Sequence, residues 1–327
     1  MVKRSLLVGL LALFLPLHSA AQALEKVTFA SVKLGTIGFI THIAKVNRLD
    51  EQNGLDLDLK FFTPTEGINA FLFKKVDAGF VGIIPALRAN AKGSRVRLLA
   101  PMLTSHFGII TSANAPYRTV DELKGKKVGT LPRVSGVYSS LALVARMKGI
   151  DIEKDFRLVL GAPQVLQGLL QKRELDAVVQ FDQNTIRMMA AGTFREMQTL
   201  EDLWKEVTGG DYLLSVALAA HEEWIRANPD RARRLARTIT AAIREIRTNP
   251  LRAVEVSREV LGYTNDREKE LAARRLPPMY PNQWNERTLD NTRLAIRKSA
   301  EYGLLEPEAL RHLEELFSEM PRELSFQ

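Results

Sequence analysis

Short apolar segments alternate with longer amphipathic segments along the first two hundred residues after Lys26. The apolar segments are rich in β-branched and aromatic residues, which is typical of strands, whereas the longer segments have the spacing of helices. Alternation of this kind predicts β-α-β units, in which helices cover a largely parallel sheet. We predict strands at residues 27–32, 55–62 and 78–84, and helices at 39–47 and 66–74.

The same order of elements returns further along the chain, with strands predicted at 127–131, 156–160 and 177–181 and helices at 136–148 and 163–172. Two local patterns return with it. Glycine can end a helix in the left-handed conformation, and a charged turn before Asp-Ala leads into a buried strand. The repeat therefore predicts two lobes of one architecture. The matching segments are Gly54-Leu55-Asp56-Leu57 with Gly149-Ile150-Asp151-Ile152, and Lys74-Lys75-Val76-Asp77-Ala78 with Arg173-Glu174-Leu175-Asp176-Ala177.

Two extended stretches, residues 97–112 and 211–218, flank the second unit, and a mostly helical tail follows. If both stretches connect the lobes, the tail packs back on the first lobe and the paired crossings form a hinge beside a cleft. We therefore predict an α/β fold of two Rossmann-like lobes with a ligand cleft between them. The predicted division is lobe 1 at 24–107, lobe 2 at 108–213, and a helical second part of lobe 1 at 214–327.

The first residues have the composition of a secretory signal. Lys3 and Arg4 precede an apolar run from Leu6 to Leu17, and Ala21-Gln22-Ala23 offers a cleavage site. The run is shorter than the roughly 20 residues that span a bilayer. We expect residues 1–23 to be removed and the mature protein to be free in the periplasm. The sequence contains no cysteine, which excludes disulfides, a thiol nucleophile and lipid attachment at a cysteine.

The charge balance is basic, with 46 Lys and Arg against 38 Asp and Glu, and losing Lys3 and Arg4 leaves 44 basic residues. Much of the excess lies in the tail, for example at residues 231–237, where acidic residues are close by. A solvated helix face explains this pattern better than a nucleic-acid surface does. We expect no nucleic-acid partner.

Three segments resemble a known family: residues 40–59, residues 76–82 and residues 119–129. The chain resembles the substrate-binding proteins of ABC importers for nitrate, sulfonate, taurine and thiamine precursors, which have the type II periplasmic-binding-protein fold. The resemblance implies a monomer that needs no cofactor and delivers a small molecule to a permease in the inner membrane. Two departures lie near the expected cleft, so the relatives' ligands do not carry over. Phe181-Asp182-Gln183 replaces the Trp-Glu-Pro of many relatives, and Ile40-Thr41-His42 replaces Pro-Leu-Tyr.

In doubly wound lobes the ligand lies outside the carboxyl ends of the strands, against helix N-termini that favour anions. This rule selects candidate ligand-binding residues by position. They are Lys33, Thr36, Phe39, Thr65 and Ile83 in lobe 1, Ser105 and His106 at the crossing, and Arg133, Ser135, Gly136, Tyr138, Phe181 and Asp182 in lobe 2.

Each candidate has a functional and a structural interpretation. Ser135 can cap a helix beside the ligand while Gly136 lets the backbone approach, and Arg133 either reaches an anion or is solvated. The rings of Phe39, Tyr138 and Phe181 could stack on a ligand or belong to the core. Lys33 either donates to the ligand or is an ordinary exposed loop lysine. His106 either donates to the ligand or is an ordinary buried histidine.

The ligand class stays open between two types. Lys33, His106 and Arg133 favour a small organic anion such as a sulfonate or carboxylate. Asp182 would repel an anion unless it paired with Arg133, so it favours an aminated or heterocyclic compound such as a thiamine pyrimidine precursor. The five histidines lack metal-ligand spacing, and no G-x-S-x-G or H-E-x-x-H motif is present, so we expect no catalytic residue and no metal site. A sensing adaptor for a membrane receptor, and an enzyme on this architecture, are the alternatives.

Overall fold

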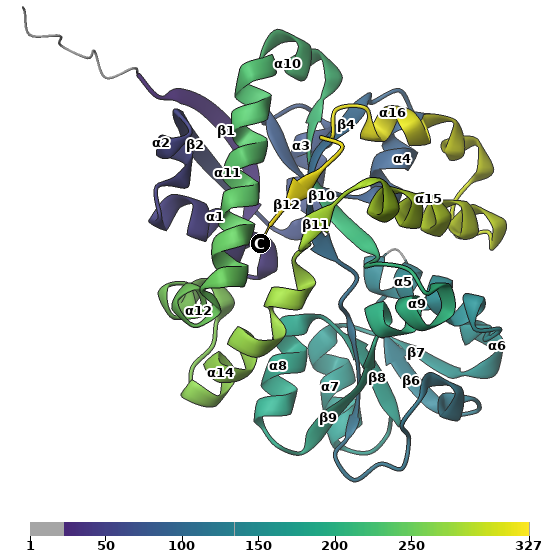
Figure 1. Ribbon diagram of the computed structural model, residues 1–327. Helices are drawn as coiled ribbons and strands as arrows, with labels where there is room; N and C mark the ends of the chain where they lie inside the picture. Colours follow the sequence, from purple (N-terminus) through teal and green to yellow (C-terminus); the bar gives the residue numbers. More distant parts are fainter. Residues whose placement is uncertain (1–22, 134, 327) are drawn as a thin grey trace, which may run out of the picture.

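The computed structural model describes residues 23–133 and 135–326, so almost all of the predicted signal peptide lies outside the described residues. Two five-stranded sheets lie one above the other in Figure 1, with helices packed around both. We call lobe 1 the part built around the first sheet and lobe 2 the part built around the second. The two-lobed α/β architecture confirms the predicted fold class. The exact lobe boundaries given above stay a prediction.

The sheet of lobe 1 consists of β1 (Glu25–Val32), β2 (Leu55–Phe62), β3 (Ala78–Gly82), β4 (Val96–Thr104) and β10 (Leu214–His221). Its strand order is β2-β1-β3-β10-β4. β1 pairs in parallel with β2 and β3, whereas β10 runs antiparallel to β3 and β4. Strand β10 thus lies between β3 and β4 in a sheet whose other strands come from the beginning of the chain.

The sheet of lobe 2 consists of β5 (Gly108–Ser112), β6 (Lys127–Thr130), β7 (Arg157–Leu160), β8 (Ala177–Gln180) and β9 (Phe194–Thr199). Its order, β7-β6-β8-β5-β9, repeats that of lobe 1, because β6 is parallel to β7 and β8 while β5 is antiparallel to β8 and β9. The predicted strands and helices of both units are present, with ends that match or are shifted by at most three residues.

Helices follow the strands in each lobe and pack around the sheets (Figure 1). Those of lobe 1 before the first crossing are α1 (Thr36–Val46), α2 (Leu49–Gln52), α3 (Pro64–Leu72) and α4 (Ile83–Ala91). Those of lobe 2 are η1 (Val120–Leu123), α5 (Gly136–Met147), α6 (Ile152–Asp155), α7 (Pro163–Gln171), α8 (Asp182–Ala190) and α9 (Leu200–Thr208).

The repeated sequence patterns have the same geometry in both lobes. Gly54 and Gly149 are left-handed with φ of 70° and 79°, and Lys74 and Arg173 share φ near 60°, at 57° and 61°. The carboxylate that follows accepts a backbone N–H from the first half of the first strand of each unit. Asp77 Oδ2 lies 2.8 Å from Thr28 N, and Asp176 Oδ2 lies 2.9 Å from Lys127 N. The Asp-Ala pattern is therefore a hydrogen-bonded tie between neighbouring strands.

The tail is helical, as predicted, apart from two short strands. Its elements are α10 (Glu222–Ala227), α11 (Pro229–Thr248), α12 (Pro250–Val256), α13 (Arg258–Leu261), α14 (Asp266–Arg275), η2 (Pro277–Met279), β11 (Gln283–Trp284), α15 (Glu286–Glu301), η3 (Pro307–His312), α16 (Leu313–Phe317) and β12 (Leu324–Ser325). Helix α11 packs on α1 and β4 of lobe 1 and buries an aliphatic stripe that includes Leu235, Ile239 and Ile243. Each such side chain contributes about 1.5–3 kcal/mol of transfer free energy.

The tail also reaches lobe 2, which the sequence did not predict. Helix α14 packs on α8 and α15 packs on α5. Trp204 of lobe 2 is fully buried and donates through Nε1 to Asn291 Oδ1 of α15 at 3.0 Å. None of the helices among the described residues combines the length and apolar character needed to cross a membrane.

Candidate ligand-binding site

The carboxyl ends of β1 and β3 in lobe 1 and of β6 and β8 in lobe 2 each lead into a helix, namely α1, α4, α5 and α8. Two chain segments cross between the lobes beside these ends, and they pair where Ser105 N donates to Leu213 O at 2.8 Å. The strand ends of lobe 1 and lobe 2 approach each other closely. Gly35 of lobe 1 lies so near Gln183 of lobe 2 that a Cβ on Gly35 would be 3.3 Å from Gln183 Oε1. The candidate residues that were selected because they follow strand ends therefore come from both lobes and lie at the junction between them.

In lobe 1 the loop after β1 contains Lys33, which is exposed, and Thr36, whose carbonyl accepts a hydrogen bond from the Tyr280 hydroxyl at 3.2 Å. Phe39 is fully buried and its ring lies edge-on to Tyr280, with centroids 6.1 Å apart. Phe39 therefore contributes to the core of lobe 1 beneath the loop, and Lys33 is the solvent-facing charge.

The other two lobe 1 candidates lie in the first turns of helices. Thr65 is exposed in α3, whose N-cap Thr63 and Glu66 form a capping box. Ile83 is buried at the start of α4, directly after Gly82. Of the two, Thr65 has the hydroxyl that is free to meet a ligand.

The crossing residues are buried and polar. The hydroxyls of Ser105 and Ser140 lie 3.3 Å apart, which links the crossing to α5 of lobe 2. Burial, and after it the nearby Arg275 guanidinium, lowers the pKa of His106 to about 3. His106 is therefore neutral at physiological pH, and its 4.0 Å separation from Glu201 is not an ion pair. The positive charge expected from His106 is absent.

The loop before α5 caps that helix as predicted, because Ser135 Oγ accepts from Tyr138 N at 3.2 Å. A Cβ on Gly136 would meet nothing within 4 Å, so the start of α5 is open. Arg133 forms a bidentate pair with Glu153, at 2.9 and 2.8 Å, and the Tyr138 hydroxyl also donates to Glu153. Arg133 therefore already has a carboxylate partner within lobe 2.

Phe181 is the aromatic candidate that remains available, since it is 41% exposed at the start of α8. Its ring lies edge-on to Phe107 with centroids 6.2 Å apart. Asp182, the next residue, is buried and pairs with Arg275 of the tail at 2.8 Å, and not with Arg133. Burial raises the pKa of Asp182 to about 6, although Arg275 opposes the rise.

Sequence reasoning missed Phe107, Glu196 and Arg275. Gly108 was the available signal, because a glycine within a strand often marks a close approach. A Cβ there would lie 2.3 Å from Glu196 Oε1 and 3.2 Å from Arg275 Nη2. Nothing in the tail pattern marked Arg275, which belongs to a helix with exposed basic residues.

Two buried threonines end strands at this edge of the sheets. Thr104 is the last residue of β4 and Thr130 is the last of β6, and neither hydroxyl has a hydrogen-bond partner among the described residues. A buried hydroxyl without a partner costs free energy, so a ligand that satisfied either group would gain from it.

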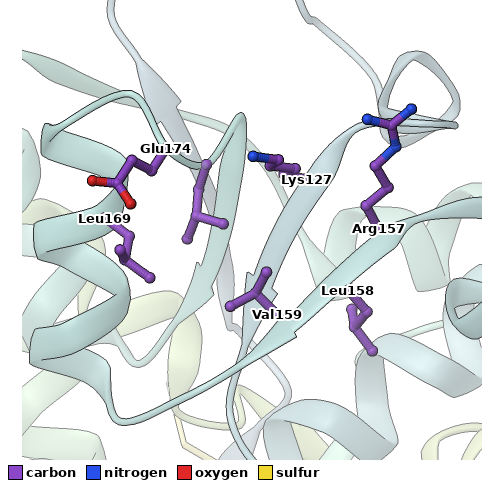
Figure 2. Close-up of a pocket in the computed structure, with 7 residues that line it drawn as sticks. Lys127, Arg157, Leu158, Val159, Leu169 and Glu174 are labelled. Atoms are coloured by element: carbon purple, nitrogen blue, oxygen red, sulfur yellow. The ribbon is translucent and has the colours of Figure 1, made fainter.

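Two cavities lie elsewhere. One of about 330 Å³ is lined by Lys127 and Arg157 above an apolar floor that includes Val159 and Leu169 (Figure 2). The other, of about 540 Å³, lies at the start of α11 beside Glu25. Lys127, Arg157 and Glu25 are the first residues of their strands, so both cavities lie at the opposite sheet edge from the candidate site. Among residues 23–133 and 135–326, no group of three His, Asp or Glu side chains is placed to hold a metal ion.

Two lobes of repeated topology, joined by paired crossings and meeting at their strand ends, define the type II periplasmic-binding-protein class. The chain belongs to the NMT1/THI5-like family, whose model matches residues 51–253. This match confirms the resemblance seen in the sequence. A search of curated proteins gives no match to the chain.

Solved structures share the fold at low sequence identity. The periplasmic aliphatic sulphonate binding protein SsuA of Escherichia coli is 19% identical with a TM-score of 0.71, over 89% of this chain and 98% of that one. The alkanesulfonate-binding protein SsuA of Xanthomonas axonopodis pv. citri, bound to MOPS, is 17% identical with a TM-score of 0.68, over 91% and 98%. The periplasmic nitrate-binding protein NrtA of Synechocystis PCC 6803 is 12% identical with a TM-score of 0.64, over 90% and 86%.

Proposed function

We propose that this protein is an extracytoplasmic solute-binding protein of an ABC importer that captures a small organic molecule by hinge closure. One observation carries the proposal: two sheets of the same strand order bring their carboxyl ends and helix starts together beside a double crossing. A ligand that contacts both lobes favours the closed form, whereas one that contacts a single lobe shifts nothing. The fold of known sulfonate- and nitrate-binding proteins supports this role.

The charges around the strand ends support a sulfonate- or carboxylate-like anion as the ligand. Arg133 is paired with Glu153, His106 is neutral, and Asp182 is paired with Arg275. Lys33 then remains as the exposed cation, together with the N–H groups at the starts of α1 and α5. Phe181 offers an apolar surface for the rest of the molecule.

A flat heterocycle is the second candidate, favoured by the Phe107–Phe181 pair. The carboxylate that would have met its amino group, Asp182, already binds Arg275. A cationic heterocycle therefore has to compete with a buried guanidinium, whereas a neutral ring need only stack on Phe181.

Native mass spectrometry of protein purified from its own periplasm tests the proposal most directly. We expect a co-purified small molecule that is released unaltered on denaturation. Calorimetric titration with an alkanesulfonate, nitrate, an aliphatic carboxylate and a thiamine pyrimidine precursor then separates the ligand classes. Conversion of a bound molecule into a product would replace this proposal with an enzymatic one. A neighbouring permease and ATPase gene pair would favour an importer over a sensing adaptor.

Substitutions in lobe 2 locate the site. Phe181→Ala should weaken binding of the identified ligand about 5- to 150-fold, since stacking and burial contribute about 1–3 kcal/mol. Phe73→Ala is the matched control, because Phe73 is 73% exposed at the far end of α3. Arg133→Ala should also weaken binding of an anion, since it leaves the Glu153 carboxylate without its cation near the start of α5. Unchanged affinity in both site variants would move the site elsewhere.

A further inference from the structure

One buried arginine joins the tail to lobe 2. Arg275, at the end of α14, has a side chain that is only 8% exposed. Its Nη2 donates to Asp182 Oδ1 of α8 at 2.8 Å, and its Nη1 donates to Glu196 Oε2 of β9. Nη2 also lies 3.4 Å from the carbonyl of His106 at the crossing. A single guanidinium thus bridges two carboxylates and touches the hinge.

The cluster has one negative charge too many when both carboxylates are ionised. His106 is neutral and adds no positive charge. On the neighbouring α9, Glu201 is paired with Lys205 at 2.7 Å, and Asp202 accepts from Thr199 at the start of the helix. Around the cluster the remaining groups are Arg187, which donates to the Gly262 carbonyl, and the buried hydroxyls of Tyr263 and Tyr280, whose pKa values burial raises. Among the described residues, Arg275 is the only cation hydrogen-bonded to either carboxylate.

The Glu196 carboxylate packs directly against the backbone of Gly108 in β5. Glu196 Oε1 lies where a Cβ of Gly108 would be, at 2.3 Å, and it has no hydrogen-bond partner among the described residues. Arg275 Nε likewise has none. A proton on Glu196 would remove the excess charge and leave the guanidinium paired with Asp182.

The contact lies between parts that belong to different lobes. The tail helices before α14 pack on lobe 1, through α11 and α13 against α1. Beside Arg275, lobe 2 makes two more contacts with the tail: Gln183 Nε2 donates to Leu261 O at 3.1 Å, and Arg187 Nη2 donates to Gly262 O at 2.8 Å. We call Asp182, Gln183, Arg187 and Glu196 together with Leu261, Gly262 and Arg275 the clasp.

We propose that Arg275 is a positioning residue that holds the lobes together through the clasp, and that the clasp tightens when it binds one proton. Opening that separates α8 from α14 would return Asp182 and Glu196 to water. The proposal rests on the proposed function only in that closure is the step that captures the ligand.

The direction of the pH effect follows from burial. Burial raises the pKa of Glu196 from 4.5 to about 7, with Arg275 opposing the rise, and raises that of Asp182 from 3.8 to about 6. The two carboxyls titrate as a coupled pair, and the clasped form binds the proton more tightly than a solvated form does. The stabilisation of the clasped form by this proton is complete below the ordinary pKa of a carboxyl group. It is lost as pH rises through about 7, the pKa of Glu196 in the clasp. The clasp should therefore be tight at mildly acidic pH and weaker above neutrality.

The distance between the lobes, measured without ligand, tests the proposal. The chain has no cysteine, so Asn69→Cys on α3 and Gln164→Cys on α7 can carry spin labels without background. In pulsed electron–electron double resonance we expect the ratio of the closed to the open population to rise as pH falls from 8 to 5. For one proton the rise is up to about tenfold per pH unit. A distance distribution that does not change with pH overturns the proposal.

Glu196→Gln imitates the protonated carboxyl and should give the closed distance at every pH, with no titration. Asp182→Asn is the second variant and should also flatten the pH profile. Glu174→Gln, at an exposed carboxyl outside the clasp, should titrate like the parent. If Glu196→Gln and Asp182→Asn both keep the parent profile, the clasp does not hold the proton. Ligand binding is measured separately, by calorimetry. A lobe distance that does not change with pH would therefore overturn the clasp and leave the proposed function standing, and an absence of ligand binding would overturn the proposed function and leave the clasp standing.

Discussion

Lobe 1 and lobe 2 are alike at the amino ends of their strands and different at the carboxyl ends. At the amino ends, Asp77 and Asp176 make the same tie to a neighbouring strand, after left-handed Lys74 and Arg173. At the carboxyl ends, β3 leads through Gly82 to the buried Ile83, whereas β8 leads to the exposed Phe181 and to Asp182, which the tail holds. The repeat thus maintains the scaffold, and the lobes diverge where a ligand would be held.

The largest expected effect on stability comes from the contact between the tail and lobe 2. Arg275→Met leaves Asp182 and Glu196 buried without a cation, which should lower the free energy of unfolding by about 3–5 kcal/mol. Arg274→Met, at the exposed neighbour, should change it by less than about 0.5 kcal/mol. Urea unfolding at pH 8 measures both. Equal effects of the two substitutions would mean that the buried pairing contributes nothing.

The tie shared by both lobes should matter equally in each. Asp77→Ala and Asp176→Ala each remove the carboxylate acceptor of a backbone N–H that water can reach, at a cost of about 0.5–1.5 kcal/mol. Hydrogen exchange should show the loss of protection in β1 for the first variant and in β6 for the second. Glu319→Ala, at an exposed residue, is the control. If either variant lost protection in the other lobe instead of its own, the two ties would not be equivalent.

Two glycines sharpen the contrast between buried and open positions in lobe 2. Gly108→Ala must displace Glu196 and should cost about 1–3 kcal/mol, as overpacking usually does. Gly136→Ala meets open space in the first turn of α5 and should be neutral or slightly stabilising. Thermal unfolding of both variants gives the comparison, and an unaffected Gly108→Ala would contradict the crowding.

The smallest expected effect again compares equivalent positions. Lys74→Gly and Arg173→Gly relieve a left-handed backbone in each lobe and should raise stability by at most about 1 kcal/mol. Lys75→Gly, one residue later, should lower it. Chemical unfolding resolves the sign. Opposite signs at the two equivalent positions would show that the turns differ energetically.

The fold could be predicted because its signals are local. Glycine positions, charged turns and apolar runs located the ends of the repeated strands and helices to within three residues. The site was predictable only by position: strand ends pointed to Ser135 and Phe181, but not to which charges are already paired. Arg275 lies 93 residues from Asp182, in a helix that reads as solvated, and the neutrality of His106 follows from burial that no pattern in its neighbours reveals.

The position of β10 between β3 and β4 has a consequence for how the chain acquires its structure. Val216 pairs with Gly82 and Leu103, so the sheet of lobe 1 cannot be completed until both segments exist, whereas every strand of lobe 2 lies between Gly108 and Thr199. Pairing across a long loop is slow because the loop must close first. We expect lobe 2 to fold first as a continuous unit and lobe 1 to wait, with an open sheet edge, for the arrival of its last strand.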